Sequence, residues 1–305
     1  MRRCPTLIVG LVLALLVACS PAISHQRPTA GNTSARASSP KSLLVSADWL
    51  ADHLSDANLR VVDLRRRADY RAGHIQHAVQ FDLGTVRAEV DGVPGQVAPP
   101  ETATEVFGKL GISAHTTVVI YDAGDSLDAA RLFWTLEYYS HPDVRLLDGG
   151  LAAWQAGAHP LSVEPPAVTP AVFVPTPDPA RMAGTAEVLA ALDDPATALV
   201  DARSPGEFAG QDVRAARGGH IPGAVNIDWS LNLNNDLTFK SAEWLRAMYE
   251  AAGVTPDREV IVYCQTGHRA SVTYFVLRWL GYPTVRLYDG SWAEWGNDPS
   301  LPVEP

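Results

Sequence analysis

The strongest constraint on the fold is an internal repeat, because two copies of one segment are expected to fold in the same way. Residues 43–160 and 183–305 share four landmarks in the same order: an apolar run ending in Asp, a Gly-His-Ile triplet, a second apolar run, and a segment containing Asp-Gly. They lie at 59–65, 73–75, 117–122 and 145–150 in the first copy, and at 198–203, 219–221, 259–264 and 286–291 in the second. The chain therefore contains two homologous domains.

The spacing of these landmarks predicts the class of fold. Short apolar runs are typical of strands buried on both faces of a parallel sheet, and an amphipathic helix follows the second run in each copy. We therefore expect two α/β domains, each a mainly parallel sheet flanked by helices. Residues 161–182 are rich in proline, which predicts a semi-rigid linker between the domains.

The N-terminus has the pattern of an export signal. Two arginines are followed by an apolar run over residues 7–18, too short to span a bilayer, and then by Cys19. The sequence Leu-Val-Ala-Cys at 16–19 resembles the lipobox of bacterial lipoproteins. That resemblance implies that residues 1–19 are a signal peptide cleaved before Cys19, and that the lipidated cysteine anchors the protein, facing the periplasm or the cell exterior. A cleaved signal without lipidation is the alternative.

The remaining bulk properties restrict the partners. Residues 20–42 are rich in small and polar residues and are expected to form a disordered tether. The net charge of −10 opposes binding to nucleic acid, so we expect small-molecule or protein partners, a membrane contact through lipid only, and a monomer. The nine histidines are scattered and Cys264 would be the only free thiol left, so we expect neither a metal nor another cofactor.

A loop in the second copy is the candidate reactive site. An apolar strand at 260–263 leads into a loop that precedes a helix starting near Arg269. Backbone N–H groups in such a loop, together with the positive end of the helix dipole, form an anion site. This would favour the thiolate of Cys264, the form that attacks sulfur. The loop residues expected to bind the substrate or persulfide are Gln265, Thr266, Gly267, His268 and Arg269.

This loop, together with segments 201–203, 219–224 and 288–295, resembles rhodanese-type sulfurtransferases over residues 43–300. The resemblance implies that Cys264 accepts sulfur as a persulfide and passes it to cyanide or a thiol, with ping-pong kinetics. It also implies that the first domain is inactive, because Asp122 stands where the cysteine would be. We expect Asp201 and Arg203 to form a structural pair that supports the loop.

The likeness also bears on the sulfur donor. Family members that use 3-mercaptopyruvate have a neutral loop and an arginine immediately before the aromatic position occupied here by Phe208. This chain has Glu207 instead, and the positive Arg269 suits the thiosulfate dianion, so thiosulfate is the expected donor. Arg214 and Arg217 lie nearby and keep mercaptopyruvate open as an alternative.

Two other kinds of function remain possible. Dual-specificity phosphatases and arsenate reductases share a strand, cysteine loop and helix, but five residues separate their cysteine and arginine. Four residues separate Cys264 from Arg269, which makes a smaller cradle and disfavours phosphate. A membrane-tethered sulfur carrier or binding module, which passes its persulfide only to a protein partner, is the non-enzymatic alternative.

Overall fold

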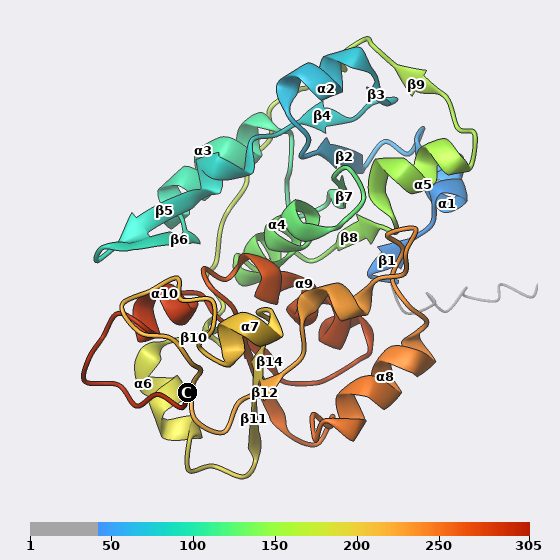
Figure 1. Ribbon diagram of the computed structural model, residues 1–305. Coiled ribbons are helices and arrows are strands. Elements are labelled where there is room, and N and C mark those ends of the chain that lie inside the picture. Colours follow the sequence, from blue (N-terminus) through green and yellow to red (C-terminus); the bar gives the residue numbers. More distant parts are fainter. Residues whose placement is uncertain (1–41) are drawn as a thin grey trace, which may run out of the picture. The chain divides into compact units, whose positions relative to one another are not determined.

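The computed structural model describes residues 42–305, which contain two five-stranded parallel sheets with helices beside them (Figure 1). This confirms the predicted α/β class. The strand orders are β1-β8-β7-β2-β4 and β10-β14-β13-β11-β12, so each strand of the first sheet has a counterpart in the same place in the second. The predicted signal peptide, Cys19 and all of the predicted tether except Ser42 lie outside the described residues.

The first copy contains the following elements. Its main sheet consists of β1 (Leu44–Val45), β2 (Leu59–Asp63), β4 (Val79–Gln80), β7 (Thr117–Tyr121) and β8 (Val144–Leu147). Two antiparallel pairs join β3 (His74–Ile75) to β9 (Leu161–Ser162) and β5 (Arg87–Val90) to β6 (Val93–Val97). The helices are α1 (Ala47–His53), α2 (Arg67–Ala72), η1 (Leu83–Val86), α3 (Pro100–Lys109), α4 (Leu127–Tyr138) and α5 (Gly150–Ala156).

The second copy repeats this arrangement. Its sheet consists of β10 (Met182–Ala183), β11 (Thr197–Asp201), β12 (Val225–Asn226), β13 (Glu259–Tyr263) and β14 (Val285–Tyr288). The helices are η2 (Pro179–Arg181), α6 (Thr185–Ala191), α7 (Pro205–Phe208), η3 (Trp229–Asn232), α8 (Ala242–Ala251), α9 (His268–Trp279) and α10 (Ser291–Trp295). The central strands β7 and β13 are buried along almost their whole length, as expected for strands covered on both faces.

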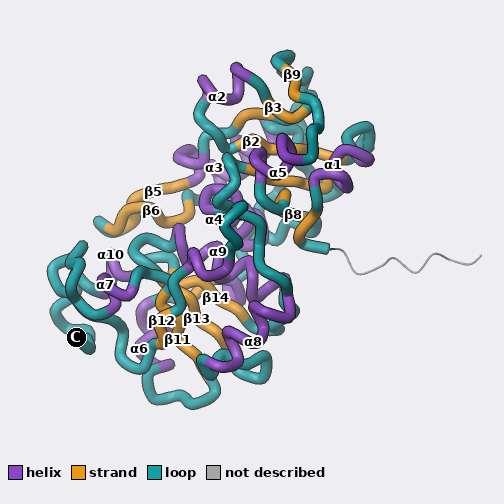
Figure 2. Tube along the Cα trace, turned by 45° about the vertical axis from the view of Figure 1, so that its right-hand side comes forward, coloured by secondary structure: helices purple, strands orange, loops and turns teal. Residues whose placement is uncertain are grey.

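Two corresponding helices join the copies. Helices α4 and α9 run side by side (Figures 1 and 2), and Phe133 packs edge-on against Phe275 with ring centroids 5.0 Å apart. Glu137 accepts a hydrogen bond from Tyr274 at 2.7 Å and from Arg278 at 3.2 Å. Both helices are buried along most of their length, so several polar side chains of these predicted amphipathic helices find partners inside the protein.

A reciprocal exchange of hydrogen bonds also links the copies. The β5–β6 hairpin reaches the second copy, where the Val97 N–H donates to the Asp289 carboxylate at 2.7 Å. A turn in the second copy reaches back, and the Phe239 N–H donates to the Asp148 carboxylate at 2.8 Å. Asp148 and Asp289 occupy the same place in the repeat, so each copy holds the other's Asp-Gly segment. The sequence interpretation did not include these hairpins.

The structure also refines the linker. β9 pairs with β3, so residues 161–162 extend the first copy although the sequence interpretation assigned them to the linker.

Candidate active site

Cys264 directly follows β13 and is almost completely buried, with 1% of the residue exposed to solvent. The carbonyl groups of Cys264 and Gln265 accept N–H bonds from α10, at 3.0 and 2.9 Å. The Ser291 hydroxyl accepts the N–H groups of Cys264 and Gly267 at 3.2 and 3.0 Å, and donates to the Tyr288 carbonyl. The loop is thus held from the α10 side.

Four other backbone N–H groups of the loop have no acceptor in the described part of the protein. Within residues 42–305, no acceptor contacts the N–H groups of Gln265, Thr266, His268 or Arg269. α9 begins at His268, so the last two belong to the first turn of a twelve-residue helix, where N–H groups lack intrahelical partners. Helix N-termini with such free donors favour negative charge.

The first copy shows what this geometry does to a charged side chain. Asp122 occupies the place of Cys264, and its carboxylate accepts N–H groups of Gly124, Ser126 and Ala129 at 2.9, 3.1 and 3.2 Å. Burial and the neighbouring Asp125 raise the pKa of Asp122 to about 6, against the lowering effect of these N–H groups. The strand, loop and helix therefore direct backbone donors at the side chain in this position.

Gly267 is required by its conformation and its surroundings. Its φ is +72°, and a Cβ there would lie 2.7 Å from the Arg131 Nη1 and 2.8 Å from the Asp289 Oδ1. Both neighbours belong to a buried ion pair, so they cannot move away easily. Glycine alone avoids both the left-handed strain and the clash.

We predict that Gly267→Ala lowers the free energy of unfolding by more than Gly223→Ala. Gly223 has nearly the same φ, +73°, but no atom lies within 4 Å of its added Cβ, so it isolates the backbone strain of about 1–2 kcal/mol. Chemical denaturation of both variants measures the difference. Equal losses would contradict the predicted clash.

The predicted structural pair lies below the loop. Arg203 donates to Asp201 at 3.0 Å through Nε and to the Gly219 carbonyl at 2.8 Å, and both charged side chains are almost fully buried. The guanidinium also stacks over Trp292 at 4.4 Å. In the first copy, Arg65 bonds Asp63 and the Gly73 carbonyl in the same way. Because the pair occurs in a copy without the cysteine, its geometry favours a supporting role.

Arg269 has a carboxylate partner that the sequence interpretation did not assign. Its guanidinium donates two hydrogen bonds to Glu207, at 2.6 and 2.8 Å, and Arg214 lies 3.5 Å from the same carboxylate. Burial opposes ionisation of Glu207, but the hydrogen bonds and charge of Arg269 outweigh it and lower its pKa to about 2. The charge of Arg269 is therefore largely balanced within the protein.

A pH titration should reveal this pairing. The lowered pKa of Glu207 contributes stability above the unfolded pKa of 4.5, and this is lost as the pH falls toward about 2. We expect the unfolding free energy of the wild type to fall more steeply than that of Glu207→Gln between about pH 5 and pH 2. Glu243→Gln changes an exposed glutamate of α8, and its curve should follow that of the wild type. Parallel curves for wild type and Glu207→Gln would contradict the pairing.

The remaining predicted loop residues contact different parts of the chain. His268 lies 2.9 Å from Asp128 of the first copy, an ion pair when the imidazole is protonated. Gln265 donates to the Arg214 carbonyl at 3.0 Å, while its Oε1 is buried without a partner. Arg217 donates to several backbone carbonyls, including those of Trp295 and Leu301. Since these bonds hold the C-terminal segment, the idea that Arg217 grips a substrate carboxylate is not supported.

Three contributors to the site come from outside the predicted loop. Arg131, in α4 of the first copy, donates to Asp289 at 2.6 Å, and both side chains are almost completely buried. Ser291 holds the loop N–H groups described above. Asp289 and Ser291 belong to a repeat landmark, which could have indicated their role, and a buried arginine in an apolar helix could have indicated Arg131.

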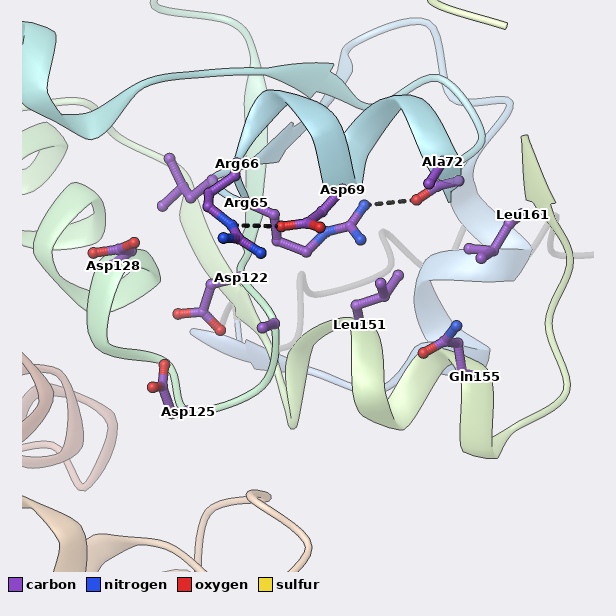
Figure 3. A pocket seen from close by; sticks show the side chains of 13 residues that line it. Arg65, Arg66, Asp69, Ala72, Asp122, Asp125, Asp128, Leu151, Gln155 and Leu161 are labelled. Atoms are coloured by element: carbon purple, nitrogen blue, oxygen red, sulfur yellow. Dashed lines mark hydrogen bonds and ion pairs between the residues drawn. The ribbon is translucent and has the colours of Figure 1, made fainter. Parts of the chain in front are cut away.

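A pocket of about 680 Å³ opens beside the corresponding loop of the first copy (Figure 3). Asp122, Asp125 and Asp128 lie along one side of it, near the exposed Arg66–Asp69 ion pair. Within residues 42–305, no group of three or more His, Cys, Asp or Glu side chains could hold a metal ion. The same residues contain no helix that is both long and apolar enough to cross a membrane.

Comparison with known proteins gives one family for both copies. The model of the Rhodanese-like domain matches residues 46–157 and 185–298. The chain is 41% identical to the sulfur carrier protein TtuD of Thermus thermophilus, covering 86% of this chain and 96% of that protein. It is 37% identical to the thiosulfate sulfurtransferase of Azotobacter vinelandii, covering 86% and 97% respectively.

Solved structures are similar as well. A complex of the anaerobic ergothioneine biosynthesis enzyme from Chlorobium limicola with trimethyl histidine aligns with a TM-score of 0.78 at 27% identity. The alignment covers 86% of this chain and 70% of that one. A variant of EanB, in complex with ergothioneine covalently linked to a persulfide cysteine, aligns with a TM-score of 0.77 at 27% identity, covering 86% and 70%.

Proposed function

The chain belongs to the rhodanese family, and on that basis we propose that it moves a sulfur atom from thiosulfate to a thiophilic acceptor through a persulfide on Cys264. The observation that carries the proposal is the loop after β13, whose free N–H groups begin a helix next to this thiol. The names of its relatives support sulfur transfer as the general activity.

The chemistry follows from the loop. The Cys264 thiolate attacks the outer sulfur of thiosulfate, the sulfur–sulfur bond of the donor breaks, and sulfite leaves with the bonding electrons. The persulfide anion that remains on Cys264 is stabilised by the loop N–H groups and the helix dipole. Cyanide then attacks the outer sulfur, forming thiocyanate and returning the thiolate, which gives a ping-pong cycle.

The residues around the loop lack the carboxylate clamp expected for 3-mercaptopyruvate, which favours thiosulfate as the donor. Glu207 stands at the position where mercaptopyruvate-using members have arginine, and its carboxylate is bonded to Arg269. Arg214 is 2.6 Å from Asp212 and 3.5 Å from Glu207, and Arg217 is bonded to backbone carbonyls, so neither presents a free cation. Specificity depends on the difference between these interactions for the two donors.

Mass spectrometry tests the proposal directly. Incubation of the purified protein with thiosulfate should add the mass of one sulfur atom to the peptide containing Cys264, and cyanide should remove it. The release of sulfite should match the amount of persulfide. Failure to detect added sulfur on Cys264 while the protein turns over thiosulfate would refute the mechanism.

A sulfur carrier is the second candidate, because the relative with 41% identity is named as one. In that case the persulfide would form on Cys264 but pass to a protein partner. The near-complete burial of Cys264 is compatible with a restricted acceptor. Stoichiometric persulfide formation without turnover of cyanide or small thiols would favour this candidate over the enzyme.

We further propose that the protein is exported and anchored by lipid on Cys19. The support is the signal-like segment at 1–19, which lies outside the described residues. Expression of the full chain in a bacterium should place it in the membrane fraction, and Cys19→Ala should release it in soluble form or block its processing. Equal fractionation of both proteins would contradict lipidation.

A further inference from the structure

The first copy brings an arginine to the reactive loop of the second. A Cβ at Gly95, in β6, would lie 2.5 Å from the Arg87 Nη2 and 3.4 Å from the Thr266 Cβ, so the guanidinium and the loop meet around this glycine. The Arg87 Nε donates to the Gly95 carbonyl at 3.3 Å. Arg87 is therefore carried by the β5–β6 hairpin to a place beside the Cys264 loop.

Arg87 differs from the other arginines of the site in having no carboxylate partner. Arg131 is paired with Asp289 and Arg269 with Glu207, at 2.6 Å in each case. No carboxylate among residues 42–305 lies within ion-pair distance of Arg87. Burial and then Arg131 lower the pKa of Arg87, while negative groups that include the Cys264 thiolate oppose this. A half-buried cation in this setting is stabilised by a bound anion.

The repeat provides an internal comparison. Within the first hairpin Arg87 pairs with Val97, and at the same place in the second copy Leu233 pairs with Phe239. The turn that follows Leu233 reaches the Asp122 loop of the first copy, where Leu237 lies close to Gly124. The position of Arg87 is thus taken in the second copy by the buried Leu233, so the cation occurs only in the hairpin that reaches the loop with the thiol.

A cavity gives an anion access to this arginine. It measures about 580 Å³ and is lined by Arg65, Arg66, Arg67 and Arg87, together with Asp128 and other residues. The cavity is lined by first-copy residues, and two of them, Arg87 and Asp128, lie next to Thr266 and His268 of the Cys264 loop. Several arginines around one cavity raise the local concentration of a small anion.

We propose that Arg87 is a specificity-determining residue that binds the oxyanion end of the sulfur donor, so that the silent domain completes the donor site of the catalytic one. This inference rests on the proposed transfer of sulfur from a thiosulfate-type anion. Arg269, held by Glu207, then helps to shape the loop, and Arg87 supplies the unbalanced positive charge.

The two half-reactions of the ping-pong cycle separate this role from a structural one. We expect Arg87→Ala to lower kcat/KM for thiosulfate about tenfold or more, the effect of losing a charge-assisted hydrogen bond. kcat/KM for cyanide should stay unchanged, because cyanide reacts with a persulfide already formed. Arg87→Lys should restore part of the thiosulfate effect. Arg71→Ala, an exposed arginine that does not line this cavity, is the matched control and should leave both values unchanged.

Equilibrium binding provides a second measurement that needs no turnover. Thiosulfate titrated into the Cys264→Ser protein should bind, and adding Arg87→Ala should weaken this binding about tenfold or more. Unchanged thiosulfate binding and kcat/KM in Arg87→Ala would overturn the inference, and so would equal losses in both half-reactions. If the wild type still formed the persulfide, the proposed function would survive that result, whereas absence of the persulfide in the wild type would overturn the function itself.

Discussion

Cys264→Ser should reduce sulfur transfer from thiosulfate to cyanide by about a thousandfold or more, since removal of a nucleophile leaves only residual catalysis. A serine hydroxyl is only weakly nucleophilic toward sulfur at neutral pH and cannot hold a persulfide. The change is small in volume, so the fold should survive. Thiocyanate formation measures activity, and circular dichroism checks the fold.

The repeat offers a matched control for this prediction. Asp122→Asn alters the equivalent position of the first copy, where the carboxylate accepts three N–H groups. It should leave sulfur transfer near the wild-type level, because no persulfide can form there. Turnover by Cys264→Ser equal to that of the wild type would refute the assignment of the nucleophile. Loss of activity in Asp122→Asn with an intact fold would show that the first loop also takes part.

Arg131→Met should lower the free energy of unfolding by about 3–5 kcal/mol, because it leaves the Asp289 carboxylate buried without its partner. Arg131 and Asp289 have side chains that are 0% and 2% exposed, so water cannot replace the lost ion pair. Activity should fall as well, since both side chains border Gly267 of the Cys264 loop. Urea denaturation and the rate of persulfide formation measure the two effects.

Two variants make this prediction specific. Arg131→Met combined with Asp289→Asn should recover part of the lost stability, since no unpaired charge then remains in the core. Arg66→Met removes an arginine from an ion pair with side chains 87% and 43% exposed, and should cost less than about 1 kcal/mol. If Arg131→Met were no more harmful than Arg66→Met, the buried pair would not hold the two copies together as described.

The buried pair also shows that the first copy does more than space the second one apart. Val97 and Arg131 of the first copy both bond the Asp289 carboxylate, next to the loop that contains Cys264. In the opposite direction, Phe239 bonds Asp148. The geometry of each loop therefore depends on the other copy.

The repeat, the buried strands and the cysteine loop were predictable because they depend on local patterns. An apolar run followed by a glycine-containing turn and a helix specifies the strand, loop and helix wherever it occurs, and it occurs twice. The Asp201–Arg203 pair could be predicted for the same reason, since its two members are only two residues apart in the sequence. Glycine at 267 marked the left-handed turn at the start of the helix.

Tertiary structure alone decided how charge is distributed around that loop. Arg269 meets Glu207 across 62 residues, Arg131 meets Asp289 across 158, and Arg87 reaches the loop from a hairpin of the other copy. Burial makes each of these charges sensitive to partners a few ångströms away, and sequence spacing carries no information about such distant partners. The candidate cysteine could thus be proposed from the chain alone, whereas the pairing of the charges beside it became visible only in the folded pair of domains.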